Sequence, residues 1–222
     1  MIDQVAKCPP RRTFNREFRI IVHELGHVLI ARLRDAVVTS VSIIADDVSE
    51  GRVLGSWRFK AFARGDIDAR DIRAELQSRM PRPGEDHLPA ASVTQEIMEQ
   101  VVEYMGGRAA EQLVLRGRPS PALDDFRQAR ELAAIICISP KSIDRFVRFA
   151  EQQAEDLLRP HIDLIFALIP ELRDRREMTG AEIDAVIAGI LARFALKNEQ
   201  ARRRDWVQRI ERAAIFAAQS RE

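Results

Sequence analysis

Two histidines and a glutamate lie close together in an apolar stretch near the start of the chain. The stretch reads IVHELGHVLI and places His23, Glu24 and His27 among aliphatic residues. Residues four apart share one face of a helix, so the two imidazoles can hold one metal ion between them. Glu24 is adjacent around the helix, within reach of a water on that metal. The HExxH spacing therefore predicts a zinc site that activates water.

Zinc at such a site suits the hydrolysis of amide bonds. It lowers the pKa of its water from about 15.7 to about 7. Glu24 can then take a proton as the water attacks a peptide carbonyl and return it to the leaving amine. Gly26, between the two histidines, costs roughly 1 kcal/mol relative to alanine, which predicts that another element approaches closely there. The alternative interpretation is a helix whose His and Glu side chains face solvent, because HExxH also occurs by chance.

The third ligand is less clearly marked. A catalytic zinc usually keeps three protein ligands and one open position. His87 and His161 are the remaining histidines, and both positions are more typical of surface residues. A carboxylate is the better candidate, but spacing leaves open the pair Asp124-Asp125 and Glu103. Asp at a helix start is also a common cap, so the acidic pair has a purely structural interpretation.

Helical periodicity predicts a mainly α chain around these groups. Ser92 and Gln95 fit a capping box at the start of one helix, and Thr179 with Glu182 fits the start of another. Two strands joined by an acidic, glycine-containing turn are expected in the segments VVTSVSII and RVLGSWRF. Residues 61–80 predict a polar helix or a long loop. The expected helices cover residues 15–34, 92–105, a resumed segment after Gly106-Gly107, 124–138, 142–168, 180–196 and the tail from residue 198.

Composition narrows the cellular setting. The chain has 222 residues, of which 46% are hydrophobic and 31% charged, with a formal net charge of +1. Near-neutral charge gives no reason to expect a nucleic-acid partner. Cys8 and Cys137 are far apart and lack metal-type spacing, which suits a reducing compartment. Because no run approaches the roughly 18 apolar residues of a membrane span, we expect a cytoplasmic protein.

Three segments in order resemble the peptidase domain of FtsH-type zinc proteases, the membrane-anchored AAA proteases. They are HELGH, MGGRAAEQLVL and SPALDDFRQARELA. In that family a later helix opens with the aspartate that is the third zinc ligand, and the match of Asp125-Phe126 to that segment selects Asp125. The resemblance covers about residues 14–192. It implies a mainly α metalloprotease domain, residues 14–195, with a small β-hairpin or sheet beside the active site. Residues 1–13 would be an irregular leader and residues 196–222 a C-terminal helical extension.

The resemblance implies a zinc endopeptidase that cleaves unfolded or extended polypeptides. An exposed strand edge near the zinc can pair with a substrate backbone, and we assign this role to Val53, Leu54, Gly55, Ser56 and Trp57. The same hairpin could instead only cover the core, and the two interpretations are equally favoured. The carry-over assigns His23, His27 and Asp125 to zinc and Glu24 to the general base.

The chain also departs from the family. It has no GxxxxGK[ST] phosphate loop and no membrane span. Either it cleaves already unfolded substrates, or a separate ATPase supplies them, or it no longer cleaves. A homo-oligomer is possible, although the family's hexamer is built partly by the ATPase ring that is missing here.

The rival hypothesis is a catalytically silent pseudo-protease or adaptor that binds extended segments or a partner ATPase. Arg202-Arg203-Arg204 with Trp206 could dock such a partner. The more common outcome for this pattern is a solvated charged face. A retained Glu24 favours the enzyme, because a retired protease has no obvious need of that carboxylate.

Overall fold

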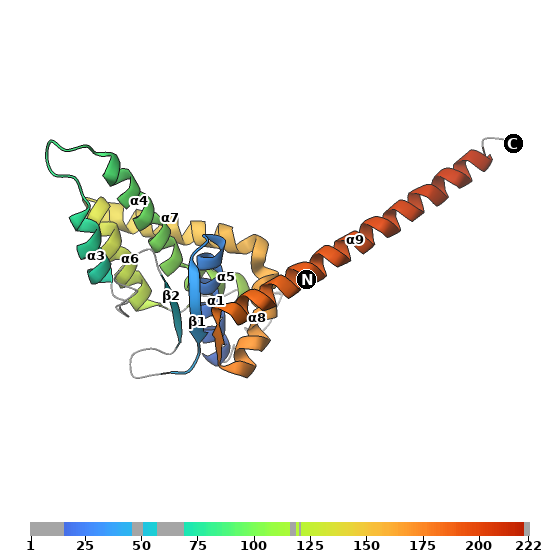
Figure 1. Ribbon diagram of the computed structural model, residues 1–222, viewed down its shortest axis with the longest axis horizontal. Coiled ribbons are helices and arrows are strands. Elements are labelled where there is room, and N and C mark those ends of the chain that lie inside the picture. Colours follow the sequence, from blue (N-terminus) through green and yellow to red (C-terminus); the bar gives the residue numbers. More distant parts are fainter. Residues whose placement is uncertain (1–15, 46–50, 57–68, 116–118, 120, 220–222) are drawn as a thin grey trace, which may run out of the picture. The chain divides into compact units, whose positions relative to one another are not determined.

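Helices form most of the computed structural model, which describes residues 16–45, 51–56, 69–115, 119 and 121–219. The chain divides into two units, one up to Gly180 and one from Ala181 onward. The elements, labelled in Figure 1, are α1 (Arg16–Leu33), β1 (Val37–Ser42), β2 (Arg52–Ser56), α3 (Ala69–Ser78), α4 (Leu88–Tyr104), α5 (Gly106–Leu115), α6 (Leu123–Ile136), α7 (Pro140–Leu158), the short 3-10 helix η1 (Arg159–His161), α8 (Ile162–Arg175), β3 (Glu177–Thr179) and α9 (Gly180–Gln219).

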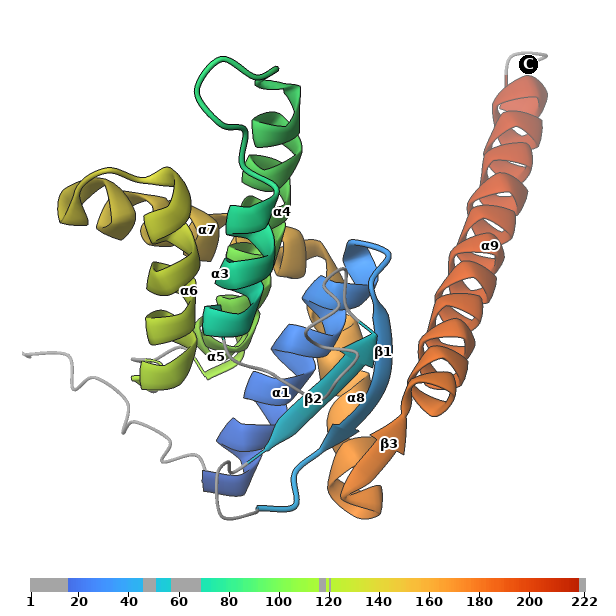
Figure 2. The ribbon, with the colours of Figure 1, turned by 60° about the vertical axis from the view of Figure 1, so that its left-hand side comes forward.

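A small antiparallel sheet lies alongside α1 (Figure 2). Its strand order is β2-β1-β3, so β1 is central and β2 is at an edge. Val41 of β1 pairs with Val53 on one side and Met178 on the other. The register of β1 and β2 shifts between Val38 and Ser40, as it does at a β-bulge. Val38 and Val41 are buried, which holds the sheet on the helical layer.

Helix α1 is the centre of the core. Its apolar residues Ile21, Leu25 and Leu29 recur at helical spacing and are buried. The helix packs closely on α5 through two glycines. A Cβ atom on Gly26 would lie 2.3 Å from the carbonyl oxygen of Gly106, and one on Gly106 would lie 2.9 Å from the carbonyl oxygen of Gly26. The close approach expected at Gly26 is therefore confirmed.

The predicted fold class is confirmed: the chain is mainly helical, with a small antiparallel sheet. The helices expected over residues 15–34 and 124–138 correspond to α1 and α6. Residues 61–80 include the helix α3, and the two predicted strands correspond to β1 and β2. Trp57 and the leader of residues 1–13 lie outside the described residues.

Two predicted helix boundaries are wrong. The capping box at Ser92 does not form, because α4 begins at Leu88 with Pro89 in its first turn, where proline is favoured. The Ser92 hydroxyl instead donates to Glu96 within the helix. The single helix expected over residues 142–168 is two helices, α7 and α8. The interruption is η1, which contains Pro160; proline lacks an amide proton and so cannot donate a helical hydrogen bond there.

The end of the first unit also differs from expectation. Residues 177–179 form the strand β3, so Thr179 belongs to a strand and α9 begins at Gly180. A three-residue strand is too short to show an alternating pattern in sequence.

The second unit consists of α9 from Ala181. The helices expected over residues 180–196 and in the tail are one continuous helix of 40 residues. After Gly180 this stretch contains no proline and a single glycine, so nothing in the sequence breaks it. The division into a domain of residues 14–195 and an extension of residues 196–222 stays a prediction. Across the parts of the chain that the structure describes, no helix combines the length and apolarity needed to cross a bilayer.

Candidate metal centre

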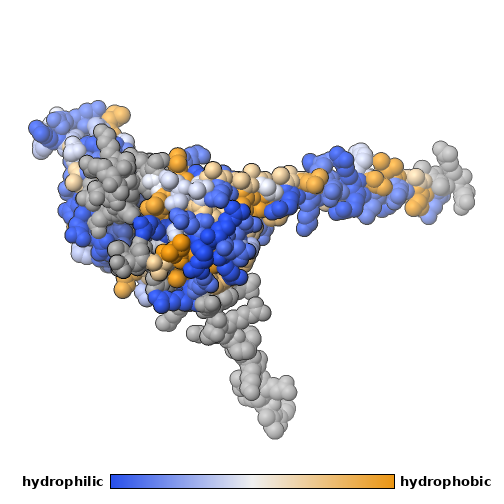
Figure 3. Space-filling view, turned by 60° about the horizontal axis from the view of Figure 1, so that its bottom comes forward, coloured by the Kyte–Doolittle hydropathy of each residue, from blue (hydrophilic) through white to orange (hydrophobic). Residues whose placement is uncertain are grey.

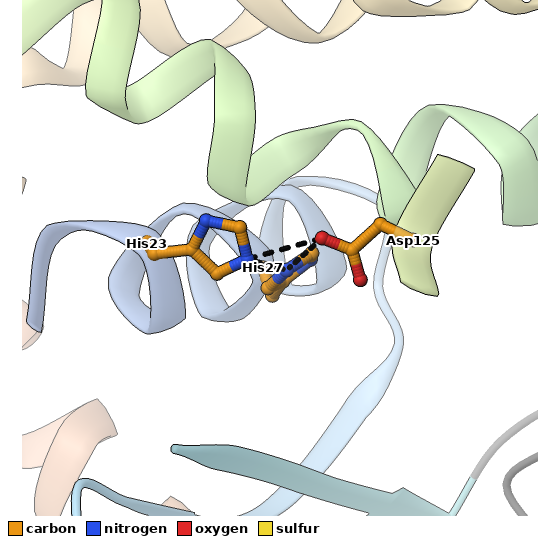
Figure 4. A group of neighbouring side chains, drawn as sticks. All are labelled: His23, His27 and Asp125. Carbon is orange, nitrogen blue, oxygen red and sulfur yellow. Dashed lines mark hydrogen bonds and ion pairs between the residues drawn. The ribbon is translucent and has the colours of Figure 1, made fainter. Parts of the chain in front are cut away.

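Three side chains from two helices converge on one point (Figure 4). His23 and His27 come from one face of α1, and Asp125 comes from the first turn of α6. The Nε2 atoms of the two histidines are 3.1 Å apart. Asp125 Oδ2 is 3.1 Å from Nε2 of His23 and 3.7 Å from Nε2 of His27. All three side chains remain 14 to 20% exposed, so the site is open to solvent on one side.

These atoms fit a tetrahedral metal ion. Two ligand atoms, each about 2.0–2.2 Å from zinc, are roughly 3.3–3.6 Å apart. The three separations in the cluster bracket that range. Two imidazoles and one carboxylate are also a common donor set for a catalytic zinc, which keeps a fourth position for water or substrate. By geometry and by donor type, the cluster can bind a metal ion.

The outer ring nitrogens fix the orientation of both imidazoles. His23 Nδ1 lies 2.9 Å from Oε1 of Glu111, and His27 Nδ1 lies 2.9 Å from the main-chain oxygen of Glu103. A carboxylate and a carbonyl only accept hydrogen bonds, so both Nδ1 atoms must donate. Each neutral ring then presents an unprotonated Nε2 to the cluster. This is the outer-shell arrangement that usually orients histidine ligands of a metal.

Glu111 is itself held in place. Its side chain is 1% exposed, and its second carboxylate oxygen accepts a hydrogen bond of 2.9 Å from Arg19. An isolated buried carboxylate would be costly, and the arginine offsets that cost. The chain Arg19–Glu111–His23 therefore connects two turns of α1 to α5 and leaves the His23 ring one position.

The carboxylates around the two histidines stabilise positive charge in the cluster. Burial alone lowers the pKa of His23, but hydrogen bonds to Asp125 and Glu111 outweigh it and raise the pKa to about 10. Burial favours the neutral form of Asp125, yet His27 and His23 together hold its pKa well below the usual range. Without a metal, a proton is therefore retained between these groups. A divalent cation can replace that proton.

Glycine 107 makes room for the two rings. A Cβ atom at this position would lie 2.6 Å from Nε2 of both His23 and His27. The side chain of an alanine at this position would clash with both Nε2 atoms. The Gly106-Gly107 pair at the start of α5 thus serves two contacts, one with the backbone of α1 and one with its imidazoles.

Glu24, next to His23 on α1, is buried, with 8% of its surface exposed. A Cβ atom on Gly51 would lie 2.6 Å from Glu24 Oε1, so this carboxylate rests against the residue that precedes β2. Burial raises the pKa of Glu24, while the nearby His27 and His23 lower it less strongly. A carboxylate with a raised pKa is better matched to proton transfer near neutral pH.

The competing ligand candidates lie elsewhere. Asp124 is exposed, and its two oxygens accept hydrogen bonds from Arg127 and Gln128. Glu103 contributes its main-chain carbonyl to His27. Among the described residues, the group of side chains placed to share a metal contains neither of these, nor His87 or His161. Of the candidates left open by spacing, Asp125 is the one that lies in the group that could hold a metal ion.

A further contact braces the helix that carries Asp125. The guanidinium of Arg108 lies 5.0 Å from the ring centroid of Phe126, and Arg108 Nε donates a 2.6 Å hydrogen bond to Glu151 of α7. Cation–π contact and ion pair together connect α5, α6 and α7 next to the cluster. Immediately before α6, Ala122 adopts a left-handed conformation with φ of 42°. That turn directs the first turn of α6 toward α1.

Sequence reasoning placed the motif residues but missed their supports. Glu111 and Arg108 both belong to the motif segment GGRAAE, but the sequence assigns neither of them a role, and Arg19 lies outside the motifs. Their hydrogen-bond partners are 43 to 92 positions away in sequence, and no local spacing marks such pairs. One usable signal existed: Glu111 falls among the small residues of an apolar helix face, where a carboxylate needs a partner.

Most of the predicted substrate segment lies in β2. Val53, Leu54, Gly55 and Ser56 belong to this strand, and Trp57 lies outside the described residues. Within the described ranges, β2 pairs with β1 alone, so its other edge faces away from the sheet. Leu54 is 38% exposed. Gly51, one residue before β2, contacts Glu24, which lies next to His23 on α1. This contact places the start of β2 near the cluster.

Fold and site together define a class: a mainly helical protein whose His/His/Asp cluster could bind a metal ion. No family model matches the chain. The ATP-dependent zinc metalloprotease FtsH of Pseudothermotoga lettingae is 32% identical to it over 136 residues. The match covers 60% of this chain and 18% of that protein, so the chain spans less than one fifth of its relative's length. The similarity to a zinc metalloprotease is thus distant and partial.

Proposed function

We propose that the protein is a zinc-dependent endopeptidase that hydrolyses unfolded or extended polypeptides. The observation that carries this proposal is the convergence of two Nε2 atoms and one carboxylate oxygen within 3.7 Å of one another. The opposite nitrogen of each ring is already engaged by an acceptor. Such an arrangement is expensive to build unless a cation uses it. The partial similarity to a zinc metalloprotease supports zinc as that cation.

In this proposal His23, His27 and Asp125 would hold the ion, and Glu24 would move the proton. Zinc, when bound, acts as a Lewis acid that makes a water molecule nucleophilic near neutral pH. The Glu24 carboxylate would accept a proton from the water that attacks the peptide carbonyl. The same carboxyl then donates the proton to the nitrogen of the leaving amine. Its raised pKa suits both halves of this transfer.

The edge of β2 is the proposed position of the substrate backbone. A peptide added as a strand uses main-chain hydrogen bonds and therefore requires an extended, unfolded segment. Val53, Leu54, Gly55, Ser56 and Trp57 would line it. Gly51, one residue before this strand, contacts the Glu24 carboxylate, which supports a path that leads along β2 to the general base.

Unfolding would be supplied from outside this segment of chain. The relative is described as ATP-dependent, but the match spans only 18% of it. We infer that the chain cleaves substrates that are already unfolded or that a separate ATPase delivers. The peptide-binding adaptor is the alternative, and cleavage decides between the two.

The test is cleavage of an unfolded model protein, without ATP, by zinc-loaded wild type and by Glu24→Gln. Loss of a general base should reduce the rate by about 10²–10⁴-fold. Zinc content should be unchanged, because Glu24 is outside the ligand set. Equal cleavage by both proteins would contradict the proposal. No cleavage by either, with zinc bound and peptide retained, would identify the adaptor.

A further inference from the structure

The three proposed metal ligands are not supported equally. His23 and His27 belong to the buried helix α1, and the outer nitrogen of each ring has its own partner, Glu111 or the carbonyl of Glu103. Asp125 comes from the first turn of α6 (Figure 4), and among the described residues its side chain contacts only the two imidazoles. Its carboxylate has no outer partner there. The position of the third ligand therefore depends on the helical turn that carries it.

The first turn of α6 receives little support from its own sequence. The first amide groups of a helix need acceptors, which a capping side chain usually provides. Ala122 occupies the capping position and makes no such hydrogen bond. Asp124 accepts hydrogen bonds from Arg127 and Gln128, but these bonds connect the helix to itself and do not fix it on its neighbours. Contacts from outside α6 must hold this turn in place.

The packing of α6 does not bring its backbone close to the helix that carries the histidines. Helix α6 packs on α3, α4 and α7. Among the described elements, neither α1 nor α5 is one of its main packing neighbours. The first turn of α6 is therefore connected to α1 and α5 through side chains.

Arg108 of α5 makes one of these side-chain connections. Its guanidinium lies 5.0 Å from the ring centroid of Phe126, the residue directly after Asp125. Its Nε donates a 2.6 Å hydrogen bond to Glu151 of α7, which fixes the guanidinium in this position. The side chains of Arg108 and Glu151 are 22% and 16% exposed, and partial burial strengthens both the ion pair and the cation–π contact.

Helix α5 supplies none of the three proposed ligands, yet it touches the support of each one. Gly107 leaves room for both imidazoles, and Glu111 accepts a hydrogen bond from His23. Arg108, between these two positions, contacts the turn that carries Asp125. The start of α5 is thus in contact with both helices that bring the ligands together.

We propose that Arg108 is a positioning residue that acts through Phe126 to hold the first turn of α6, so that Asp125 is in place before the metal ion binds. This inference rests on the metal site of the proposed function. When only a fraction of the chains has a ligand in place, the apparent affinity falls in proportion to that fraction. Arg108 therefore raises the affinity for zinc without touching the ion.

The test is the zinc affinity of Phe126→Leu, which keeps an apolar side chain and removes the ring face. We expect binding about 3–30-fold weaker than in wild type, the factor that corresponds to a lost cation–π contact. Phe126→Tyr keeps the ring and should bind zinc like wild type. Arg108→Met keeps the apolar stem and should weaken binding by a similar factor. The two losses should not add in Arg108→Met/Phe126→Leu, because both changes break one contact.

A matched control is Gln112→Ala. Gln112 is the other donor to Oε1 of Glu151, so this variant disturbs the same carboxylate and leaves Arg108 and Phe126 in place. Its zinc affinity should equal that of wild type. Circular dichroism of the metal-free proteins checks that each variant is folded. If Phe126→Leu is unfolded, Arg108→Met takes its place in the comparison below.

Repeating the change in Asp125→Ala separates positioning from general stabilisation. With the carboxylate absent, Phe126→Leu should cause no further loss of affinity, since no third ligand remains to be positioned. The same loss in both backgrounds would make the contact a general structural support and overturn the inference. Wild-type affinity in Phe126→Leu, at one zinc per chain, would overturn the inference and leave the proposed function intact. Wild type that binds no zinc would overturn both.

Discussion

Helices α1 and α9 depart from ordinary amphipathic patterning in opposite ways. Helix α1 places His23, Glu24 and His27 among buried aliphatic residues. Helix α9 places Trp206 and Phe216 in solvent. In α1 the two histidines make hydrogen bonds to groups on α4, α5 and α6. The apolar exceptions of α9 are 64% and 73% exposed, and Figure 3 shows hydrophobic surface toward the C-terminal end of this helix.

The comparison teaches where each kind of exception finds its compensation. Buried polar groups must be satisfied within the fold, so the supports of α1 can be read from distances. Exposed apolar groups are covered by a further surface, whose nature must be inferred from chemistry. The buried polar groups of α1 indicate a chemical function, and the exposed apolar groups of α9 indicate an interaction surface.

The two helices also contain glycines in opposite settings, one tightly packed in α1 and one with open space around it in α9. Alanine substitutions at these glycines should give the largest difference in the free energy of unfolding. In Gly26→Ala the new Cβ atom would meet the carbonyl oxygen of Gly106 at 2.3 Å, so the two backbones must separate. We expect a loss of about 2–3 kcal/mol in the free energy of unfolding. Gly189→Ala in α9 meets no atom within 4 Å and should stabilise its helix by about 0.5–1 kcal/mol.

Urea denaturation followed by circular dichroism measures both changes. Unchanged or increased stability of Gly26→Ala would show that the close packing of α1 on α5 is not what this glycine protects. A destabilised Gly26→Ala that still binds zinc normally would separate packing from the metal site.

Removing the support of His23 should weaken metal binding. Glu111→Ala frees the imidazole to rotate and leaves Arg19 without this carboxylate partner. Loss of an outer-shell partner typically costs 10–100-fold in affinity. Equilibrium dialysis against a zinc-binding dye checks this, with Gln112→Ala on the same helix as the control. Affinity unchanged in Glu111→Ala would mean that the ring is held by the metal and not by α5.

Zinc binding should release protons and strengthen as the pH rises. In the metal-free protein the raised pKa of His23 keeps it protonated at pH 7, and the lowered pKa of Asp125 keeps it ionised. The metal needs neutral imidazole, so it must displace about one proton from His23. Titration calorimetry in buffers of different ionisation enthalpy counts these protons. A heat of binding that does not depend on the buffer would contradict the proton held at this site.

Much of the site could be predicted because its chemistry is local. His23, Glu24 and His27 are within one and a half turns of a helix, and their spacing alone indicates their shared face. Asp125 is about 100 positions away, and only the resemblance to a family singled it out. The contacts of His23 with Glu111 and of His27 with the carbonyl of Glu103 could not be predicted, because contacts between helices depend on packing that the period of each helix does not contain.

In the fold, too, local features could be predicted from the sequence and contacts between distant segments could not. The long periodic helices α1 and α6 could be predicted, since many residues repeat the same pattern. The break at Pro160 was missed because the apolar residues on both sides continue in phase, although proline itself marks such a break. Strand β3 forms through hydrogen bonds to β1, more than 130 positions earlier, so tertiary pairing decides its state.

The measurement that tests the account most directly is zinc stoichiometry and affinity in wild type, Asp125→Asn and Asp124→Asn. The two variants change neighbouring residues by the same chemistry, and only one carboxylate faces the imidazoles. The account predicts one zinc per chain in wild type, near-normal affinity in Asp124→Asn and a large loss in Asp125→Asn. Normal zinc binding by Asp125→Asn, or loss in Asp124→Asn alone, would contradict the assigned ligand set.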